Sequence, residues 1–249
     1  MSRPLRVPHE GLIEGDFHLS EAGLKYATRV HRLRTGDVLT LFDVSTGLEA
    51  EAELLDDRVG LVRVTACRSA GRAVLPITLL AALGKGDKPE QVVRDAATLG
   101  AARVVFVQAE RSIARATGSD RGERFRRIAI ETARQCGRSD VPSVEGPVSF
   151  AEALPRPPGS EALRLIACRA VGSRPLLAVV SAERARRGAF PELEILIGPE
   201  GGFSSSEIDA AVAQGFVPVG LGPLVLRTEV AAGAVLAALW LFDDAAREA

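Results

Sequence analysis

The sequence predicts an α/β protein in which a small antiparallel β unit precedes a larger domain built around a mostly parallel sheet. Short apolar runs separated by turn residues fill the stretch from Val38 to Thr65, whereas apolar runs alternate with helical patterns from about residue 73 onward. Strands that alternate with helices at this spacing are typical of a parallel sheet covered by helices. A chain of 249 residues is long enough to fill two cores.

The N-terminal part has the rhythm of antiparallel strands. Its apolar runs include Val38–Phe42 and Gly60–Val64, and turn residues occur at Ser45–Gly47 and Asp56–Asp57. Short runs between turn residues predict strands that pair with their neighbours in the chain. The composition then changes over Ser69–Arg72, which we interpret as a linker between two domains.

The C-terminal part contains five apolar runs that are expected to form buried strands. They are Ile77–Leu83, Arg103–Val107, Leu163–Ala167, Leu193–Ile197 and Val217–Leu221. A capping box opens a helix at Asp87, because Glu90 follows three residues later, and Gly100 marks the end of that helix. A second helix is expected over 123–136, where apolar side chains recur on one face. Residues 155–159 are expected to form a surface loop.

Composition argues against several classes of function. The formal net charge of −1 provides no overall attraction to nucleic acid, so any such attraction must be local. The three cysteines form no Cys-x-x-Cys pair and the three histidines lack metal-ligand spacing, which indicates neither a disulfide framework nor a metal site. The sequence has no secretory signal pattern and no apolar stretch of membrane-spanning length, and we therefore expect a cytoplasmic protein.

A glycine-rich turn follows the expected strand Leu193–Ile197. It reads Gly198-Pro199-Glu200-Gly201-Gly202-Phe203, and the capping box formed by Ser204 and Glu207 then starts a helix that ends near Gly215. Such a turn allows backbone groups to approach a ligand closely, although a simple tight turn is the alternative interpretation of this segment alone. Its spacing matches neither the dinucleotide nor the triphosphate motif.

A second Gly-Pro loop lies over 220–229, again between a strand end and a helix start, with Thr228 as the expected N-cap. Ligands in open α/β sheets bind beyond the carboxyl ends of the strands. The two loops are therefore expected to form one ligand pocket. The helix that follows, Val230–Phe242, is apolar all round, which predicts burial on every side, and we favour a homodimer interface over a deep core position.

Taken together, these residues resemble the RsmE family within the SPOUT class of methyltransferases, over nearly the whole chain. The matching blocks are Arg29–Asp37, Lys85–Val93, Glu110–Ser112, Gln135–Pro142, Ile197–Phe203 and Leu221–Glu229. The last two blocks, in this order and about twenty residues apart, are the most specific. The chain departs from the family pattern at Leu224, which is often basic, and at Val230, where a threonine is expected.

The resemblance implies a PUA-like β-barrel in residues 1–72 that helps to hold RNA. It also implies a SPOUT-class α/β domain in residues 73–249 whose chain forms a trefoil knot, and a homodimer. The expected reaction is methylation of N3 of a uracil in 16S ribosomal RNA, with S-adenosyl-L-methionine as methyl donor. The residues implied in donor binding are Cys168, Ala170, Val171, Ile197, Gly198, Pro199, Glu200, Gly201, Gly202, Leu221, Gly222, Pro223, Val225, Leu226 and Arg227.

Methyl transfer to uracil N3 requires loss of the N3 proton, so the site must favour the imide anion. Arg227 is expected to face the base oxygens. Glu229 either accepts the proton or orients Arg227, or alternatively only complements the helix dipole. The cations expected to position RNA phosphates are Arg29, Arg32, Arg34, Lys85, Lys88, Arg111 and Arg138. For the arginines from 111 to 138, a solvated helix face is the alternative interpretation.

Two other functions stay open at this point. The donor loops do not encode the acceptor, so methylation of another base or of a ribose 2′-hydroxyl is a second interpretation. A non-catalytic RNA-binding or ribosome-assembly protein is a third, and the intact glycine-rich loops argue against it.

Overall fold

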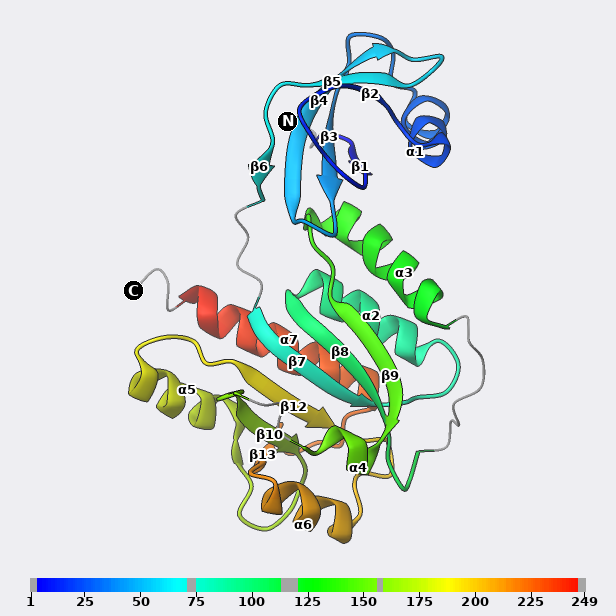
Figure 1. The fold of residues 1–249 in the computed structure, drawn as a ribbon. Helices are drawn as coiled ribbons and strands as arrows, with labels where there is room; N and C mark the ends of the chain where they lie inside the picture. The colour runs from blue at the N-terminus through cyan, green and yellow to red at the C-terminus, as the bar shows by residue number, and fades with distance from the viewer. Residues whose placement is uncertain (1–3, 71–74, 113–120, 156–158, 246–249) are drawn as a thin grey trace. The chain divides into compact units, whose positions relative to one another are not determined.

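The computed structural model describes residues 4–70, 75–112, 121–155 and 159–245, and its fold is drawn in Figure 1. The chain forms two compact units. The first comprises residues 1–72 and 129–141, and the second comprises residues 73–128 and 142–249. Each unit contains one β-sheet. The predicted linker over 69–72 lies partly outside the described residues, as does the predicted loop over 155–159.

The first unit is a six-stranded sheet with a short helical segment (Figure 1). Its strands are β1 (Arg6–Pro8), β2 (Gly15–His18), β3 (Val38–Asp43), β4 (Leu48–Asp56), β5 (Leu61–Val64) and β6 (Arg68–Ser69), and its helices are α1 (Glu21–Lys25) and the π-helix η1 (Tyr26–Val30). Strands β3, β4 and β5 pair antiparallel, which confirms the prediction for this stretch. Strand β1 adds a parallel pairing with β3. The strand path is open, because β1 and β2 lie at its two ends.

Alternation along β4 explains how this sheet buries a core. Ala50, Ala52 and Leu54 are buried, whereas the intervening Glu51 and Glu53 are exposed. Side chains alternate between the two faces of a strand, so one face of β4 is apolar and the other is solvated. The buried residues join those of β1, β3, β5 and the helical segment in one hydrophobic cluster.

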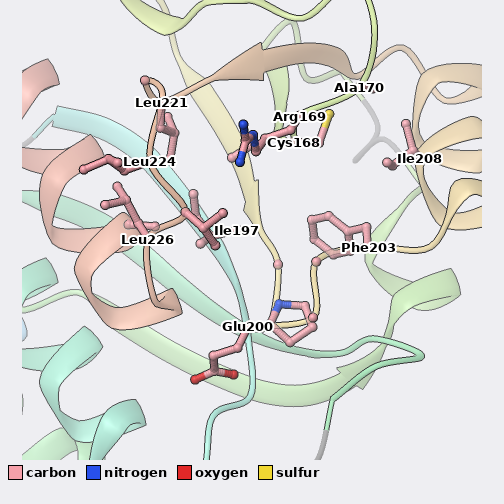
Figure 2. Close-up of a pocket in the computed structure, with 18 of the residues that line it drawn as sticks. Cys168, Arg169, Ala170, Ile197, Glu200, Phe203, Ile208, Leu221, Leu224 and Leu226 are labelled. Atoms are coloured by element: carbon pink, nitrogen blue, oxygen red, sulfur yellow. The ribbon is translucent and has the colours of Figure 1, made fainter.

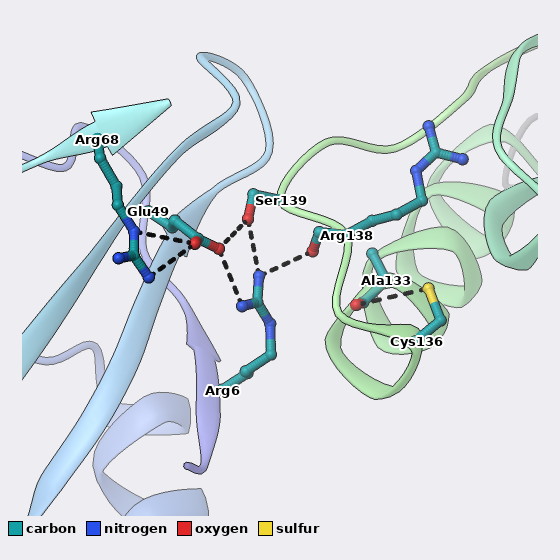
Figure 3. A network of polar contacts seen from close by, with 7 residues as sticks. All are labelled: Arg6, Glu49, Arg68, Ala133, Cys136, Arg138 and Ser139. Carbon is teal, nitrogen blue, oxygen red and sulfur yellow. Dashed lines mark hydrogen bonds and ion pairs between the residues drawn. The ribbon is translucent and has the colours of Figure 1, made fainter. Parts of the chain in front are cut away.

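A polar network connects segment 129–141 to this sheet (Figure 3). The guanidinium of Arg6 donates to Glu49 Oε2 at 3.0 Å and to Ser139 Oγ at 2.7 Å. Ser139 Oγ donates to the same oxygen of Glu49 at 2.9 Å, and Arg68 pairs with the other oxygen at 3.2 Å. Burial opposes ionisation of Glu49, but its hydrogen bonds from Arg6 and Ser139 outweigh burial and lower its pKa. The network explains why residues after 128 belong to the first unit.

The second unit is built on a seven-stranded sheet in which every neighbouring pair is parallel. Its strands are β7 (Leu75–Ala82), β8 (Ala101–Gln108), β9 (Ser143–Ser149), β10 (Leu163–Ala167), β11 (Arg174–Pro175), β12 (Leu193–Ile197) and β13 (Val217–Gly220), and the order is β11-β13-β10-β12-β7-β8-β9. The predicted mostly parallel sheet is thus confirmed, and β10 and β12 have the predicted bounds.

Helices cover both faces of this sheet (Figure 1). They are α2 (Lys88–Thr98), the part of α3 (Arg121–Cys136) up to residue 128, α4 (Phe150–Ala153), α5 (Leu176–Arg187), α6 (Ser205–Ala213) and α7 (Thr228–Ala245). The rest of α3 belongs to the first unit. Ile166, Leu196 and Leu80 are register partners and therefore point to the same face. That face shares a buried cluster with Phe150 of α4 and Ala211 of α6. Helices α2 and α7 pack against each other and against β8 and β7, respectively.

The predicted capping box at the start of α2 is absent. Asp87 precedes α2 as expected, but its side chain makes no capping hydrogen bond. Glu90 instead forms ion pairs with Arg94 and Arg124, so it is not available for a capping box. Helix α7 leaves several side chains exposed in the single chain, so its predicted burial on every side would require a subunit interface. The exposed large apolar ones are Val230 (49%), Trp240 (42%) and Leu241 (60%).

Candidate functional site

A pocket lies at one edge of the second sheet, where three neighbouring strands end (Figure 2). Strands β13, β10 and β12 are adjacent and parallel, so the loops that follow them leave the sheet at the same edge. These loops, at residues 168–170, 198–202 and 221–226, form most of the wall. The pocket volume is about 480 Å³, within the range of small-molecule sites.

The glycine-rich turn after β12 requires small residues for two reasons. A Cβ on Gly198 would lie 3.2 Å from the ring of Phe203, and one on Gly201 would lie 3.3 Å from Cβ of Arg111. Gly202 adopts a φ of +66°, and its N–H donates to the carbonyl of Pro199 at 2.8 Å. Side chains other than glycine would therefore crowd or strain the turn. The turn leaves backbone groups next to the pocket.

The helix after this turn begins with the capping box that the sequence predicted. Ser204 Oγ accepts from the N–H of Glu207 at 3.3 Å, and the Glu207 carboxylate accepts from the N–H of Ser204 at 2.9 Å. The second carboxylate oxygen of Glu207 accepts from the N–H of Glu110 at 2.8 Å. The guanidinium of Arg111 donates to the carbonyl of Gly201 at 2.8 Å. The segment after β8 therefore braces the turn.

The start of α7 is attached to the same turn. The predicted N-cap Thr228 is the first residue of the helix, and its hydroxyl donates to the carbonyl of Gly198 at 2.8 Å. Thr228 is only 3% exposed, whereas Gly198 is half-buried at the pocket. Ala231, one turn further along the helix, lines the pocket. The bond therefore links the second and third loops of the wall.

Four charged residues gather beside the turn. Lys88 forms a hydrogen-bonded ion pair with Glu200, and its Nζ lies 4.0 Å from Oε2 of Glu229. The hydrogen bond from Lys88 lowers the pKa of Glu200, and the same bond raises the pKa of Lys88. Arg227 adds a second positive charge that acts on both groups. Figure 2 shows the Glu200 side chain extending away from Phe203 and Cys168.

Most residues that the resemblance implied in donor binding line this pocket. They are Cys168, Ala170, Ile197, Gly198, Pro199, Glu200, Gly201, Gly202, Leu221, Gly222, Val225 and Leu226. Val171, Pro223 and Arg227 do not belong to the wall that the described residues form. The wall also contains residues that had not been singled out as donor contacts. They are Ala167, Arg169, Phe203, Ser205, Ile208, Leu224 and Ala231. In the sequence, the apolar residues among them that adjoin the glycine-rich turn could have indicated that the wall extends beyond the loops.

The seven cations expected at RNA phosphates lie in different environments. Arg29, Arg32 and Arg34 are exposed on η1 and the residues just after it, and Lys85 is also exposed. Lys88 and Arg111 instead have partners at the pocket. Arg138 is 4% exposed and forms two hydrogen bonds with Asp140, at 3.0 and 2.6 Å. The last three therefore have partners within the protein.

Neither a metal cluster nor a membrane span emerges from the part of the chain that the structure describes. No group of three potential metal-ligating side chains occurs there. No helix within the described ranges has the length and apolar character needed to cross a bilayer. Cys67, Cys136 and Cys168, which all lie within the described ranges, form no disulfide bond there.

Comparison with known proteins shows which family this chain matches. Residues 72–240 match the family model described as RNA methyltransferase domain. The chain is 33% identical to the ribosomal RNA small subunit methyltransferase E of Synechocystis sp. over 239 residues, which is 95% of this chain and 77% of that protein. A crystal structure of a ribosomal RNA small subunit methyltransferase E from Neisseria gonorrhoeae bound to S-adenosyl methionine is 29% identical, with a TM-score of 0.82 over 97% of this chain and 98% of that one. A Legionella pneumophila methyltransferase in complex with the same cofactor has a TM-score of 0.81 at 29% identity, over 97% and 98% of the two chains.

Proposed function

Because the chain belongs to the family of ribosomal RNA small subunit methyltransferase E enzymes, we propose that it transfers a methyl group from S-adenosyl-L-methionine to N3 of a uracil in 16S ribosomal RNA. The pocket formed by the three strand-end loops is the observation that carries this proposal. The relative from Neisseria gonorrhoeae, which covers nearly the whole chain, was crystallised with this methyl donor.

The residues of the pocket suit a donor that has apolar, polar and cationic parts. Phe203, Ile208 and Leu226 provide apolar walls, and the glycine-rich turn provides backbone donors and acceptors. The carboxylate of Glu200, whose pKa the hydrogen bond from Lys88 lowers, provides negative charge at the wall. The donor supplies a sulfonium methyl group that an electron pair on nitrogen can attack. The protein's part is mainly to hold the two reactants in line.

Arg227 and Glu229 are the proposed catalytic residues. Uracil N3 becomes nucleophilic when its proton leaves, and a guanidinium facing the base oxygens stabilises the negative charge that develops there. Arg227 is exposed at the end of the third loop and is therefore accessible to an RNA base. Glu229 follows two residues later in the first turn of α7 and is proposed to accept the proton. The base must be unpaired or turned out of its helix to reach them.

The finer architecture belongs to the same proposal. Residues 1–72 form a PUA-like β-barrel domain that holds RNA, and residues 73–249 form the SPOUT-class domain with a trefoil knot. Arg29, Arg32, Arg34 and Lys85 contact phosphates, because all four are exposed, although Arg34 also pairs with Asp57. The protein works in the cytoplasm on the small ribosomal subunit.

A homodimer formed through α7 completes this proposal. Trp240 and Leu241 are exposed although they follow a helix segment that is mostly buried. Exposed apolar side chains of this size on one helix are typical of a surface that another subunit covers. We therefore assign α7 to the subunit interface.

The decisive experiment supplies labelled methyl donor and small ribosomal subunits that lack the modification. Primer extension then maps the product. A methyl group on N3 blocks the Watson–Crick edge and stops reverse transcription, whereas a ribose methyl group leaves pairing intact. We expect a single strong stop at a uracil in the wild-type reaction and its loss in Glu229→Gln. Incorporation of label without a stop would identify another acceptor. Failure to bind the donor in calorimetry would favour a non-catalytic RNA-binding or assembly protein.

A further inference from the structure

Lys88, Glu200 and Glu229 come from three separate elements and meet beside the donor pocket. Lys88 is the first residue of α2, Glu200 lies in the turn after β12, and Glu229 lies in the first turn of α7. The ammonium of Lys88 is hydrogen-bonded to Oε1 of Glu200. It lies 4.0 Å from Oε2 of Glu229, which is close enough for strong attraction but too far for a hydrogen bond.

This arrangement leaves one oxygen of Glu229 with unused hydrogen-bonding capacity. Oε2 of Glu229 is buried and has no hydrogen-bond partner among the described residues. A buried acceptor without a donor is costly, so native sites seldom keep one without a functional reason. The imide N–H of uracil is a donor of the kind that this oxygen lacks.

We propose, on the basis of the proposed function, that Lys88 is a positioning residue, which holds Glu200 and Glu229 together and leaves Oε2 of Glu229 free to accept the N3 proton. Its ammonium attracts the carboxylate of Glu229 without occupying that oxygen. The sequence had assigned Lys88 to RNA phosphates, whereas the structure pairs its ammonium with Glu200.

The charges around Glu229 support this division of roles. Lys88 comes from α2, Glu200 from the glycine-rich turn, and Arg227 from the loop that leads into α7. Lys88 and Arg227 together balance the two carboxylates. Lys88 is the cation that bridges them, because it is within 4.0 Å of both. Arg227, which is exposed, then remains available for the oxygens of the base.

The proton and electron balance of the step is simple. The N3–H bond breaks as its proton passes to Oε2 of Glu229. The electron pair left on N3 forms the new bond to the methyl carbon, while the carbon–sulfur electrons stay on sulfur and yield a neutral thioether product.

Three variants separate positioning from phosphate contact. Lys88→Met removes the charge but keeps much of the stem, Lys88→Arg keeps the charge, and Lys85→Met is the comparator at a nearby exposed lysine. Each is assayed for kcat at saturating RNA and donor, and for the slope of log Kd for RNA against log salt. Trp240 fluorescence checks that each variant is folded, because Trp240 is the only tryptophan and lies in α7.

We expect Lys88→Met to lower kcat by roughly 10²-fold, in the range of lost acid–base catalysis, with an unchanged salt slope. Lys88→Arg is expected to recover most of this loss. Lys85→Met is expected to reduce the salt slope by about one unit. If Lys88→Met instead behaves like Lys85→Met, or changes neither quantity, or changes both, the proposal is overturned.

A third measurement does not depend on catalysis. Titration of the labelled Glu200 carboxyl carbon by NMR is expected to show its pKa rising toward the usual value in Lys88→Met, because the hydrogen bond from Lys88 is the main cause of its lowered pKa. An unchanged Glu200 pKa would mean that Lys88 does not hold this carboxylate in solution and would overturn the proposal. Wild-type protein that methylates no uracil N3 would refute the proposed function instead, while the titration and the salt slope would still decide the role of Lys88.

Discussion

Replacing Thr228 by valine tests how the start of α7 supports the glycine-rich turn. The substitution keeps the shape of the side chain but removes the hydroxyl that donates to the carbonyl of Gly198 at 2.8 Å. Because Thr228 is 3% exposed, water cannot readily replace the lost donor. A buried acceptor left without its donor costs about 1–3 kcal/mol. We therefore expect the second unit to lose about 1–3 kcal/mol of unfolding free energy.

Denaturant unfolding followed by Trp240 fluorescence measures this loss, because Trp240 lies in α7 and is the only tryptophan. The matched control is Thr98→Val in α2. The Thr98 hydroxyl donates at 2.9 Å to the carbonyl of Arg94, within its own helix and at the surface. Loss of that bond leaves an exposed helix carbonyl that water can reach, so the control is expected to change stability by less than about 0.5 kcal/mol.

Donor affinity provides the second reading of Thr228→Val. If the freed turn must be ordered again when the donor binds, the whole loss reappears as weaker binding, by about 5- to 150-fold for about 1–3 kcal/mol. Calorimetry with S-adenosyl-L-methionine measures that ratio. Equal stability of Thr228→Val and Thr98→Val, together with unchanged donor affinity, would refute the view that this bond holds the turn in place.

Three further predictions concern RNA binding, pH and assembly. Arg29→Gln is expected to reduce the salt slope of RNA binding by about 0.9 unit. Arg111→Gln is expected to leave the salt slope unchanged but to weaken donor binding, because Arg111 donates a hydrogen bond to the carbonyl of Gly201. Equal salt slopes in the two variants would contradict this prediction. Burial opposes ionisation of Asp43, but hydrogen bonds from Ser45, Gly11 and Leu12 outweigh it and lower its pKa to about 2. The ionised form therefore stabilises the first unit above the usual pKa of 3.8, and this stabilisation is lost as the pH falls toward 2. An Asp43→Asn variant should be less stable than the wild type at pH 7 by up to about 2 kcal/mol, and the difference in stability should shrink in acid. A difference in stability that does not depend on pH would argue against this prediction. Leu241→Glu is expected to give monomers in analytical ultracentrifugation, and dimers of unchanged affinity would exclude α7 from the interface.

Some strands of the second unit were predictable because their surroundings are uniform. Every residue of β12 is buried, and its sequence is apolar except for Glu194, which pairs with Arg164 of β10, so the ends of the apolar run coincide with the ends of the strand. Strand β9 was not predicted, since Gly146-Pro147 within it has the composition of a turn. The structure requires glycine at position 146, because a Cβ there would lie 2.5 Å from the carbonyl oxygen of Phe106. That close approach depends on β8 lying alongside, which local sequence does not reveal.

The predictions for two helices also failed. The spacing of Asp87 and Glu90 fits a capping box, but Glu90 is taken by Arg94 and Arg124. Arg124 lies in a different helix, so the competition depends on tertiary structure. Helix α5 was not predicted at all. Its buried residues lie in its first half, and its second half is rich in arginine, so no apolar stripe runs along the whole helix.

The donor loops were predictable in part because glycine and proline mark them wherever they occur. What the sequence could not reveal is which distant residues support them. Lys88 and Glu200 are 112 positions apart, and Arg111 and Gly201 are 90 positions apart. Clustered cations without a visible partner were interpreted as phosphate contacts, and only the fold supplies the carboxylate and carbonyl that they contact.

The strand order explains why these particular cations meet the turn. Strand β12 lies next to β7, which in turn lies next to β8, and all three are parallel. The segments that follow them therefore emerge at one edge of the sheet, which places Lys88 and Arg111 beside the turn after β12. One half of the sheet thus forms the pocket wall, and the other half supplies the cations that brace it. A substitution that shifted the β7–β12 register would accordingly disturb donor binding without changing any residue of the wall.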